Sequence, residues 1–218
     1  MRSKSELPEM IAFETKSALV RVLEFSLGEE GAKECERRIL HKYGTLSTAL
    51  SENEEELCRV CGISMNNALL IKLLAYVNSR RVIDSFRYGE DHTELEIREL
   101  LSALFLGASL EEIYLLLLDG QGRITSVEYI GEGTVNASDV FPRKMIECAL
   151  KKKAKGVILA HNHPKGNTSP SKDDLFVTGK MFNLFASAGI RLCAHYIVGD
   201  GKVGKIESDM FYNPDFNG

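Results

Sequence analysis

One short segment, residues 161–174 (HNHPKGNTSPSKDD), holds the side chains best suited to chemistry: two histidines, a serine and an aspartate. His161 and His163 are two residues apart, and side chains at this spacing leave the same face of an extended backbone, so both imidazoles can converge on one point. Pro164 favours that extended backbone, because the residue before a proline is pushed out of the helical region. Asp174 follows a stretch rich in turn-forming residues, which allows the chain to fold back toward the histidines.

Two neutral imidazoles and one carboxylate suit zinc, which takes nitrogen and oxygen ligands at roughly 2.0 to 2.2 Å and keeps a position for water in catalytic sites. Zinc lowers the pKa of that water from ~15.7 to about 7 and so provides a hydroxide nucleophile at neutral pH. The segment therefore predicts a Zn²⁺ site with His161, His163 and Asp174 as ligands, and the chemistry it favours is hydrolysis.

Ser171 and Asp174 also fit a purely structural role. The pattern Ser171-x-x-Asp174 stands directly before an apolar-periodic run, which is the form of a helix N-cap with an acidic third residue. Capping and ligation are compatible, because a carboxylate in the first turn can point toward a cation in front of the helix. Both interpretations are kept.

The elements around this segment predict an α+β or mixed α/β domain in which helices cover a sheet. The short apolar run GVILA is typical of a buried central strand, and it delivers His161 to the strand's end. The expected order is β-β-α-β-α-β-β: a hairpin at 114–118 and 124–130, a helix capped by Ser138 or Asp139, a strand at 156–160, a helix at 171–188, and strands at 191–198 and 203–206.

The N-terminal part of the chain is predicted to be all-helical, with helices at 8–26, 29–42, 45–49 and 53–60. The polar segment 87–93 (RYGEDHT) predicts a boundary between a helical module at 1–90 and a second domain at 91–218. That second domain is expected to begin with a helix capped by Thr93 and Glu96.

Residues 62–64 (GIS), followed by an apolar helix, resemble a helix-hairpin-helix unit, whose glycine-rich turn offers backbone N–H groups to a DNA phosphate. Ser64 stands where the second glycine is usual, and a serine there is also a plain N-cap. The pattern therefore favours a helical packing module over a DNA clamp.

Composition excludes several classes of protein. The 218 residues are 44% hydrophobic and 27% charged, which is typical of a soluble globular protein, and a net charge of -4 provides no overall basic field for nucleic acid or anionic lipid. No window approaches the ~20 apolar residues of a membrane span, and the first residues lack the apolar core of a secretory signal. Five scattered cysteines fit reduced thiols. We therefore expect a cytoplasmic protein.

The pattern His161-x-His163-Pro164 with Ser171-x-x-Asp174 resembles the motif of the JAMM (MPN-type) zinc metallopeptidases, with complete agreement in spacing. The wider stretches 133–136 (GTVN), 140–143 (VFPR) and 157–164 (VILAHNHP) resemble the bacterial RadC family within that group. The likeness is strong over residues 95–207 and weak before them. It departs at Phe141 and Lys165, where histidine and serine are usual.

The resemblance implies a zinc-dependent peptidase that cleaves a peptide or isopeptide amide. From the residues alone, Glu111 and Glu112 are both candidates for the group that moves protons. The resemblance selects Glu111, which stands eight residues before Asp119, and it implies that Ser171 stabilises the tetrahedral oxyanion. His195, in a later strand, is interpreted either as a neighbour of the ligands or as a core histidine.

Two other classes of function fit the sequence. A DNA-associated repair or recombination accessory protein would use the hairpin at residues 62–64 and leave the metal site secondary, although the acidic net charge argues against it. A non-catalytic MPN-type scaffold is the third interpretation, but such scaffolds can lose their ligands and here all are present. The expected partners are a peptide or protein substrate and, in the rival interpretation, DNA.

Overall fold

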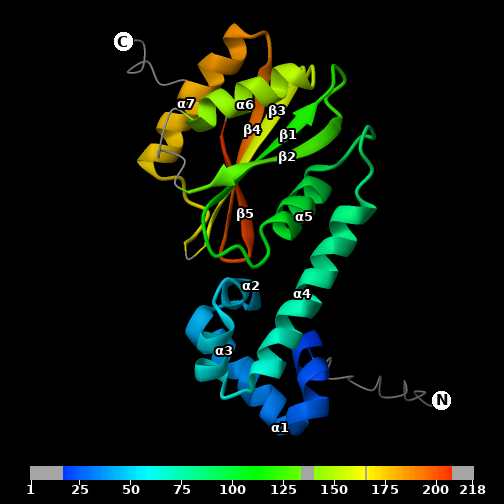
Figure 1. Ribbon diagram of the computed structural model, residues 1–218, viewed down its shortest axis with the longest axis vertical. Coiled ribbons are helices and arrows are strands. Elements are labelled where there is room, and N and C mark those ends of the chain that lie inside the picture. Colours follow the sequence, from blue (N-terminus) through cyan, green and yellow to red (C-terminus); the bar gives the residue numbers. More distant parts are fainter. Residues whose placement is uncertain (1–16, 134–139, 165, 208–218) are drawn as a thin grey trace, which may run out of the picture.

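The computed structural model describes residues 17–133, 140–164 and 166–207, and it consists of an N-terminal helical region next to a mixed sheet that is flanked by helices (Figure 1). The sheet has five strands in the order β2-β1-β3-β4-β5. Their bounds are β1 Glu112–Leu118, β2 Ile124–Glu132, β3 Gly156–His163, β4 Arg191–Gly199 and β5 Lys202–Ile206. β3 and β4 run parallel, whereas every other neighbouring pair is antiparallel.

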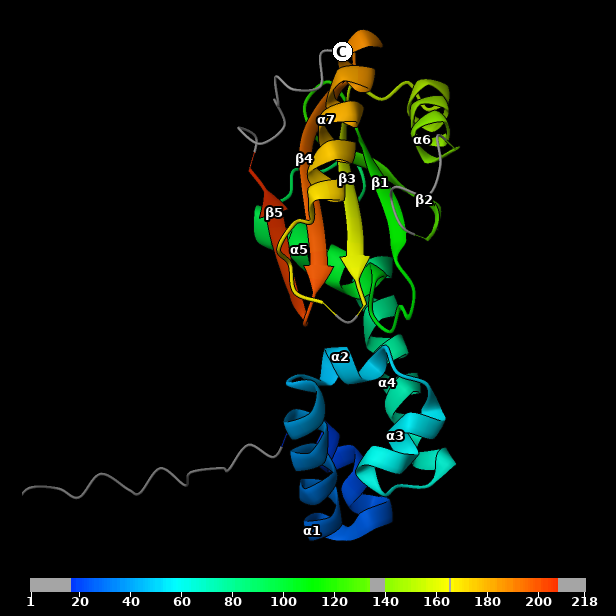
Figure 2. The same cartoon turned by 90° about the vertical axis from the view of Figure 1, so that its left-hand side faces the viewer.

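The two central strands are apolar on both faces, because each face of the sheet is covered. On one face, Leu115 and Leu117 of β1 and Leu159 of β3 pack against helices α6 (Val140–Lys151) and α7 (Lys172–Ser187). On the other face, Leu116 and Ile158 pack against α5 (Glu94–Leu104). Figures 1 and 2 show α6 and α7 on one side of the sheet and α5 on the other. Because successive side chains of a strand point to opposite faces, each of these strands contributes apolar side chains to two separate cores.

The helical region contains α1 (Ala18–Tyr43), α2 (Leu46–Leu50), α3 (Glu54–Cys61) and the first part of α4 (Met65–Ser85). It has a core of its own, which includes Leu23, Ile39, Leu57 and Ile71. α4 also reaches the sheet, because Ile83 near its end packs against the core under α5 (Figure 1). The division into 1–90 and 91–218 stays a prediction.

The start of α1 and the break inside it can be compared with the expected helical pattern. α1 begins at Ala18, where the Ser17 hydroxyl accepts a hydrogen bond from the Val20 N–H, while residues 8–16 of the expected first helix lie outside the described residues. Gly28, with φ of 70°, interrupts the helical backbone inside α1, so the break expected there is confirmed as a kink between two joined helices.

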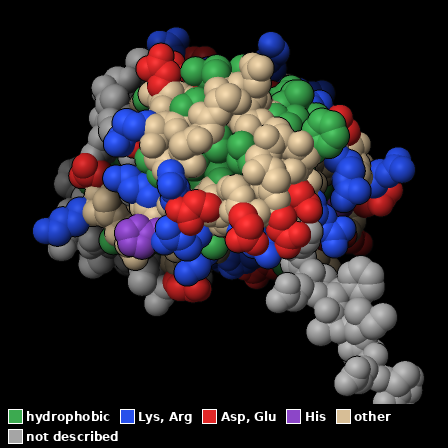
Figure 3. Space-filling view, turned by 90° about the horizontal axis from the view of Figure 1, so that it is seen from below, with side chains coloured by type: hydrophobic (Ala, Val, Ile, Leu, Met, Phe, Trp, Pro, Cys, Tyr) green, Lys and Arg blue, Asp and Glu red, His purple; other side chains and the backbone are tan. Residues whose placement is uncertain are grey.

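The turn between α3 and α4 has the hairpin form expected from residues 62–64. Gly62 adopts a left-handed backbone at the end of α3, and the Ser64 hydroxyl accepts from the Asn67 N–H and caps α4. Seen from the end opposite the sheet, cationic and anionic side chains alternate around hydrophobic ones, so this face carries charges of both signs (Figure 3).

Among the described residues, no single helix has the length and apolar composition of a membrane span. α3 and α4 meet those requirements only as a pair, and the pair is bent by 116°.

The strands confirm the order β-β-α-β-α-β-β, with one correction. β3 extends to His163, so both histidines lie inside the strand instead of beyond its end, because β4 continues to pair with β3 through His163. The expected caps of α6, Ser138 and Asp139, lie outside the described residues.

Phe185 tests the importance of the core between α7 and the sheet. This side chain is completely buried, so Phe185→Ala should lower the free energy of unfolding by about 3–5 kcal/mol in chemical denaturation. Phe176 on the same helix is 42% exposed, so Phe176→Ala should lower the free energy of unfolding by less than Phe185→Ala does. Equal losses in the two variants would contradict this assignment of the core.

Candidate metal centre

The side chains of His161, His163 and Asp174 converge at the end of β3 and the start of α7. The Nε2 atoms of the two histidines are 3.1 Å apart. Asp174 Oδ1 lies 3.0 Å from His161 Nε2, and Asp174 Oδ2 lies 3.3 Å from His163 Nε2. Among the described residues, these three form the group of histidine, cysteine and acidic side chains whose ligand atoms can share a metal ion.

The start of α7 brings Asp174 into this cluster. Ser171 is the N-cap, and it forms a capping box with Asp174: the Ser171 N–H and hydroxyl both donate to Asp174 Oδ2, each at 2.7 Å. The Asp174 N–H donates back to the Ser171 hydroxyl at 3.1 Å. The expected capping role of Ser171 is therefore present, and the same contacts aim the other carboxylate oxygen at His161.

A backbone carbonyl holds the ring of His163. Its Nδ1 lies 2.8 Å from the carbonyl oxygen of Asn167, in the loop that follows β3. That loop packs closely on Gly199, because a Cβ at Gly199 would lie 2.4 Å from the Gly166 carbonyl oxygen and 2.9 Å from that of Asn167. Since a carbonyl only accepts, Nδ1 carries the proton and Nε2 is directed at Asp174.

His161 is held by two residues that the sequence did not identify as a pair. Its Nδ1 lies 2.8 Å from His195 Nε2, and His195 Nδ1 lies 2.6 Å from the Thr178 hydroxyl. The Thr178 hydroxyl donates to the Asp174 carbonyl at 2.5 Å. Thr178 stands four residues after Asp174, on the same side of α7. From the sequence, this spacing could have indicated that Thr178 lies next to Asp174. Of the two interpretations of His195, the structure therefore shows it in contact with His161.

Burial and hydrogen bonds shift the protonation of these groups. Burial disfavours ionisation of Asp174, but its contacts with His161 and His163 outweigh that effect and hold the pKa of its carboxyl well below the usual range. The hydrogen bond to Asp174 raises the pKa of His163, with Asn167 and the Glu111 charge acting in the same direction. Complete burial lowers the pKa of His195 well below its usual value.

Glu112 is the first residue of β1 and Glu111 directly precedes it, so in an extended backbone their side chains point in opposite directions. β1 pairs with β3 through Ile113 and His161, and extending this antiparallel register by two residues brings Glu111 opposite His163. Glu111 is close enough for its carboxylate to raise the pKa of His163. Glu112 faces the other way, and its carboxylate is hydrogen-bonded to the side chain of Tyr114. Of the two, Glu111 is the one whose charge acts on the cluster.

Asn162, between the two histidines, contacts the backbone on both sides of Glu111. Its side-chain oxygen accepts from the Glu112 N–H at 2.7 Å, and its side-chain nitrogen donates to the Leu110 carbonyl at 3.1 Å. The side chain is only 3% exposed. This amide therefore fixes the chain at Glu111 relative to β3.

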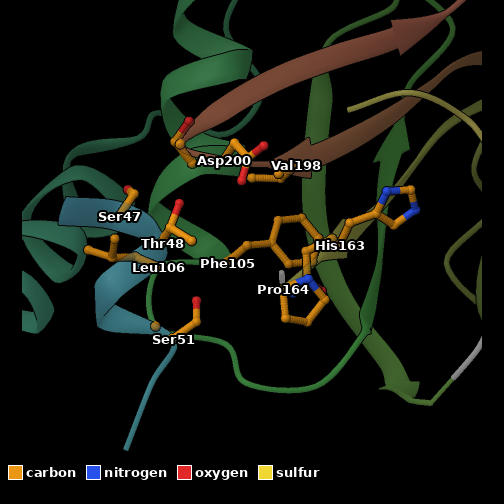
Figure 4. A pocket seen from close by; sticks show the side chains of 14 residues that line it. Ser47, Thr48, Ser51, Phe105, Leu106, His163, Pro164, Val198 and Asp200 are labelled. Carbon is orange, nitrogen blue, oxygen red and sulfur yellow. The ribbon is translucent and has the colours of Figure 1, made fainter. Parts of the chain in front are cut away.

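A small cavity of about 40 Å³ lies behind His163, between α2 and the end of the sheet. Ser47, Thr48 and Pro164 are among its lining residues. Figure 4 shows that the imidazole of His163 points away from this cavity. The cavity therefore belongs to the contact between the helical region and the sheet, not to the metal cluster.

Comparisons with known proteins show which family the chain resembles. Residues 92–208 match the RadC family, described as a RadC-like JAB domain. A UPF0758 protein of Vibrio parahaemolyticus is 31% identical over 75% of this chain and 74% of its own length. Its counterpart in Vibrio cholerae is 31% identical over 76% and 74%. The UPF0758 protein of Shewanella frigidimarina is 28% identical over 85% and 83%.

Gly199 tests whether the loop after β3 depends on close packing. Gly199→Ala must displace the loop that carries Asn167, so we expect the free energy of unfolding to fall by about 1–3 kcal/mol. Gly120→Ala is the matched control, because a Cβ there meets no atom within 4 Å. Urea denaturation of both variants measures the difference, and a Gly199→Ala protein as stable as the control would contradict the prediction.

Proposed function

This chain belongs to the RadC family, and on that premise we propose that it is a zinc-dependent hydrolase of the JAMM type, which cleaves a peptide or isopeptide amide bond with water. The observation that carries the proposal is the convergence of His161 Nε2, His163 Nε2 and the Asp174 carboxylate on one point. A cluster of three acceptors needs a cation to balance it.

The donor set fits zinc. Two imidazole nitrogens and a carboxylate oxygen are ligands that zinc takes, and ligand atoms bound tetrahedrally at zinc distances lie roughly 3.3 Å apart. The separations of 3.0, 3.1 and 3.3 Å among these atoms are close to that value. His161, His163 and Asp174 would therefore hold the ion. When bound, zinc would supply a water whose pKa falls from ~15.7 to about 7.

Glu111 is the proposed acid and base. Amide hydrolysis requires a group that takes the proton of the attacking water and then delivers it to the leaving amine nitrogen, and one carboxylate can do both. Two observations support this role: the Glu111 charge acts on His163, and Asn162 holds the backbone on both sides of Glu111. Its neighbour Glu112 faces the other side of the sheet, where it contacts Tyr114.

Ser171 is the proposed oxyanion donor. It is exposed at the start of α7, and its hydroxyl proton is given to Asp174 Oδ2 in the absence of substrate. Turning that hydroxyl toward a substrate oxygen would leave the Ser171 N–H on Asp174, so the cap would be kept in part. A donor of this kind contributes roughly 2.7–4 kcal/mol to the stability of the transition state.

Metal analysis tests the ligand assignment. We expect about one equivalent of zinc in the dialysed wild-type protein and a large loss of zinc in His163→Ala and Asp174→Asn, together with loss of cleavage of a peptide pool. His41→Ala, which removes an exposed histidine of α1, should keep both. Zinc far below one equivalent in the wild type would count against the proposal.

The two adjacent glutamates separate catalysis from metal binding. Glu111→Gln should lower kcat by roughly 10²–10⁴-fold while zinc content is unchanged, because the proton-moving group is lost and the ligands remain. Glu112→Gln is the matched control and should retain activity. If both variants cleave peptides at the wild-type rate, Glu111 has no role in proton transfer.

The DNA-associated alternative stays a prediction. The α3–α4 hairpin has the expected form, but the Ser64 hydroxyl is engaged in capping α4 and the exposed end of the helical region carries charges of both signs (Figure 3). Binding of duplex or branched DNA that weakens steeply with added salt would favour this alternative.

A further inference from the structure

A buried chain of hydrogen bonds connects two of the proposed ligands through atoms that do not face the proposed metal site. It runs from His161 Nδ1 to His195 Nε2 (2.8 Å), from His195 Nδ1 to the Thr178 hydroxyl (2.6 Å), and from that hydroxyl to the backbone carbonyl of Asp174 (2.5 Å). Exposed fractions are 1% for His161, 5% for Asp174, and zero for Thr178 and His195. Since water has little access to these groups, each proton must be placed by the protein.

The donor and acceptor of each hydrogen bond follow from the group at the end of the chain. The Asp174 carbonyl can only accept, so the single proton of the Thr178 hydroxyl is committed to it. That hydroxyl must then accept from His195 Nδ1. The His195 ring is completely buried, and its two nitrogens contact a hydroxyl and an imidazole instead of a carboxylate, so the ring is uncharged and carries its one proton on Nδ1. His195 Nε2 is left as an acceptor, and it can only receive the Nδ1 proton of His161.

We propose that Thr178 and His195 are positioning residues, which together fix the His161 ring with its proton on Nδ1 and the lone pair of Nε2 directed at the cation. This inference rests on the proposed function, because it assigns the two residues to the same metal centre. A neutral imidazole next to another imidazole can either donate or accept. The hydroxyl, with its proton already committed, removes that ambiguity.

The chain also couples the ligands to each other. It starts on a ligand in β3 and ends on the backbone of a ligand in α7, so the strand and the helix are joined through groups that lie beneath the ion. A histidine that only fills the core would not require a partner hydroxyl one helical turn after Asp174. Partners of this kind typically change metal affinity by about 10- to 100-fold when removed.

Thr178→Val is the decisive variant, because it keeps the shape of the side chain and removes the hydroxyl. We expect its zinc dissociation constant, measured by competition with a chromophoric chelator, to rise by about 10- to 100-fold. Thr178→Ser restores the hydroxyl and should bind zinc with an affinity close to that of the wild type. Circular dichroism and thermal unfolding confirm that each variant is folded.

Long-range ¹H–¹⁵N correlation spectra of the imidazoles provide a second measurement. In the wild type and in Thr178→Ser, His195 should carry its proton on Nδ1, with or without zinc, whereas Thr178→Val should lose this preference. A wild-type His195 protonated on Nε2 would overturn the inference.

The outcomes separate this inference from the proposed function. If the wild type binds zinc and Thr178→Val binds it equally well, the positioning role is wrong and the hydrolase proposal stands. If the wild type binds no zinc, the hydrolase proposal fails, and a cation-directing role for Thr178 and His195 fails with it.

Discussion

Burial of the Asp174 carboxylate is the constraint on which the site depends. A carboxylate that is only 5% exposed must be paired, because an isolated buried charge is very costly. The Ser171 N–H and hydroxyl donate to Oδ2, which also lies near His163 Nε2, whereas Oδ1 faces His161 Nε2. The helix start therefore supplies the hydrogen bonds of the carboxylate, and the strand supplies the imidazoles with which it would share a cation. An arrangement that separated α7 from β3 would keep the Ser171 hydrogen bonds but remove those imidazoles.

The sheet supplies the rigidity that this balance requires. β3 lies in the centre of the sheet, hydrogen-bonded to β1 on one side and to β4 on the other, so the positions of His161 and His163 are set by two registers at once. A slip of one residue would turn both imidazoles to the face that packs against α5. The apolar side chains of β3 on both faces resist such a slip, because each face contributes to a different core. The stability of the fold and the geometry of the site thus rest on the same strand pairings.

The features predicted from sequence were those encoded locally. The spacing of His161 and His163, the capping pattern of Ser171 with Asp174 and the order of strands and helices depend on neighbours within a few residues, and the structure has all of them. The partners of His161 were not predictable in this way. His195 reaches His161 only because β4 pairs in parallel with β3, and sequence alone does not fix which strands pair. The choice between Glu111 and Glu112 likewise depends on the register of β1 against β3, which no local pattern specifies.

The alternation of β3 explains how one short segment can organise both the ligands and the proposed acid and base. His161 and His163 point to the face of the sheet covered by α7, and Asp174 lies in the first turn of that helix. Asn162 between them cannot reach that face, and its amide instead bonds to the backbone on both sides of Glu111. His161 and His163 therefore place the imidazole nitrogens of the proposed site, and Asn162 between them holds the backbone next to Glu111. We expect a substitution at Asn162 to leave the proposed ligands in place but to free the backbone that carries Glu111, so the proposed metal binding and proton transfer should be separable.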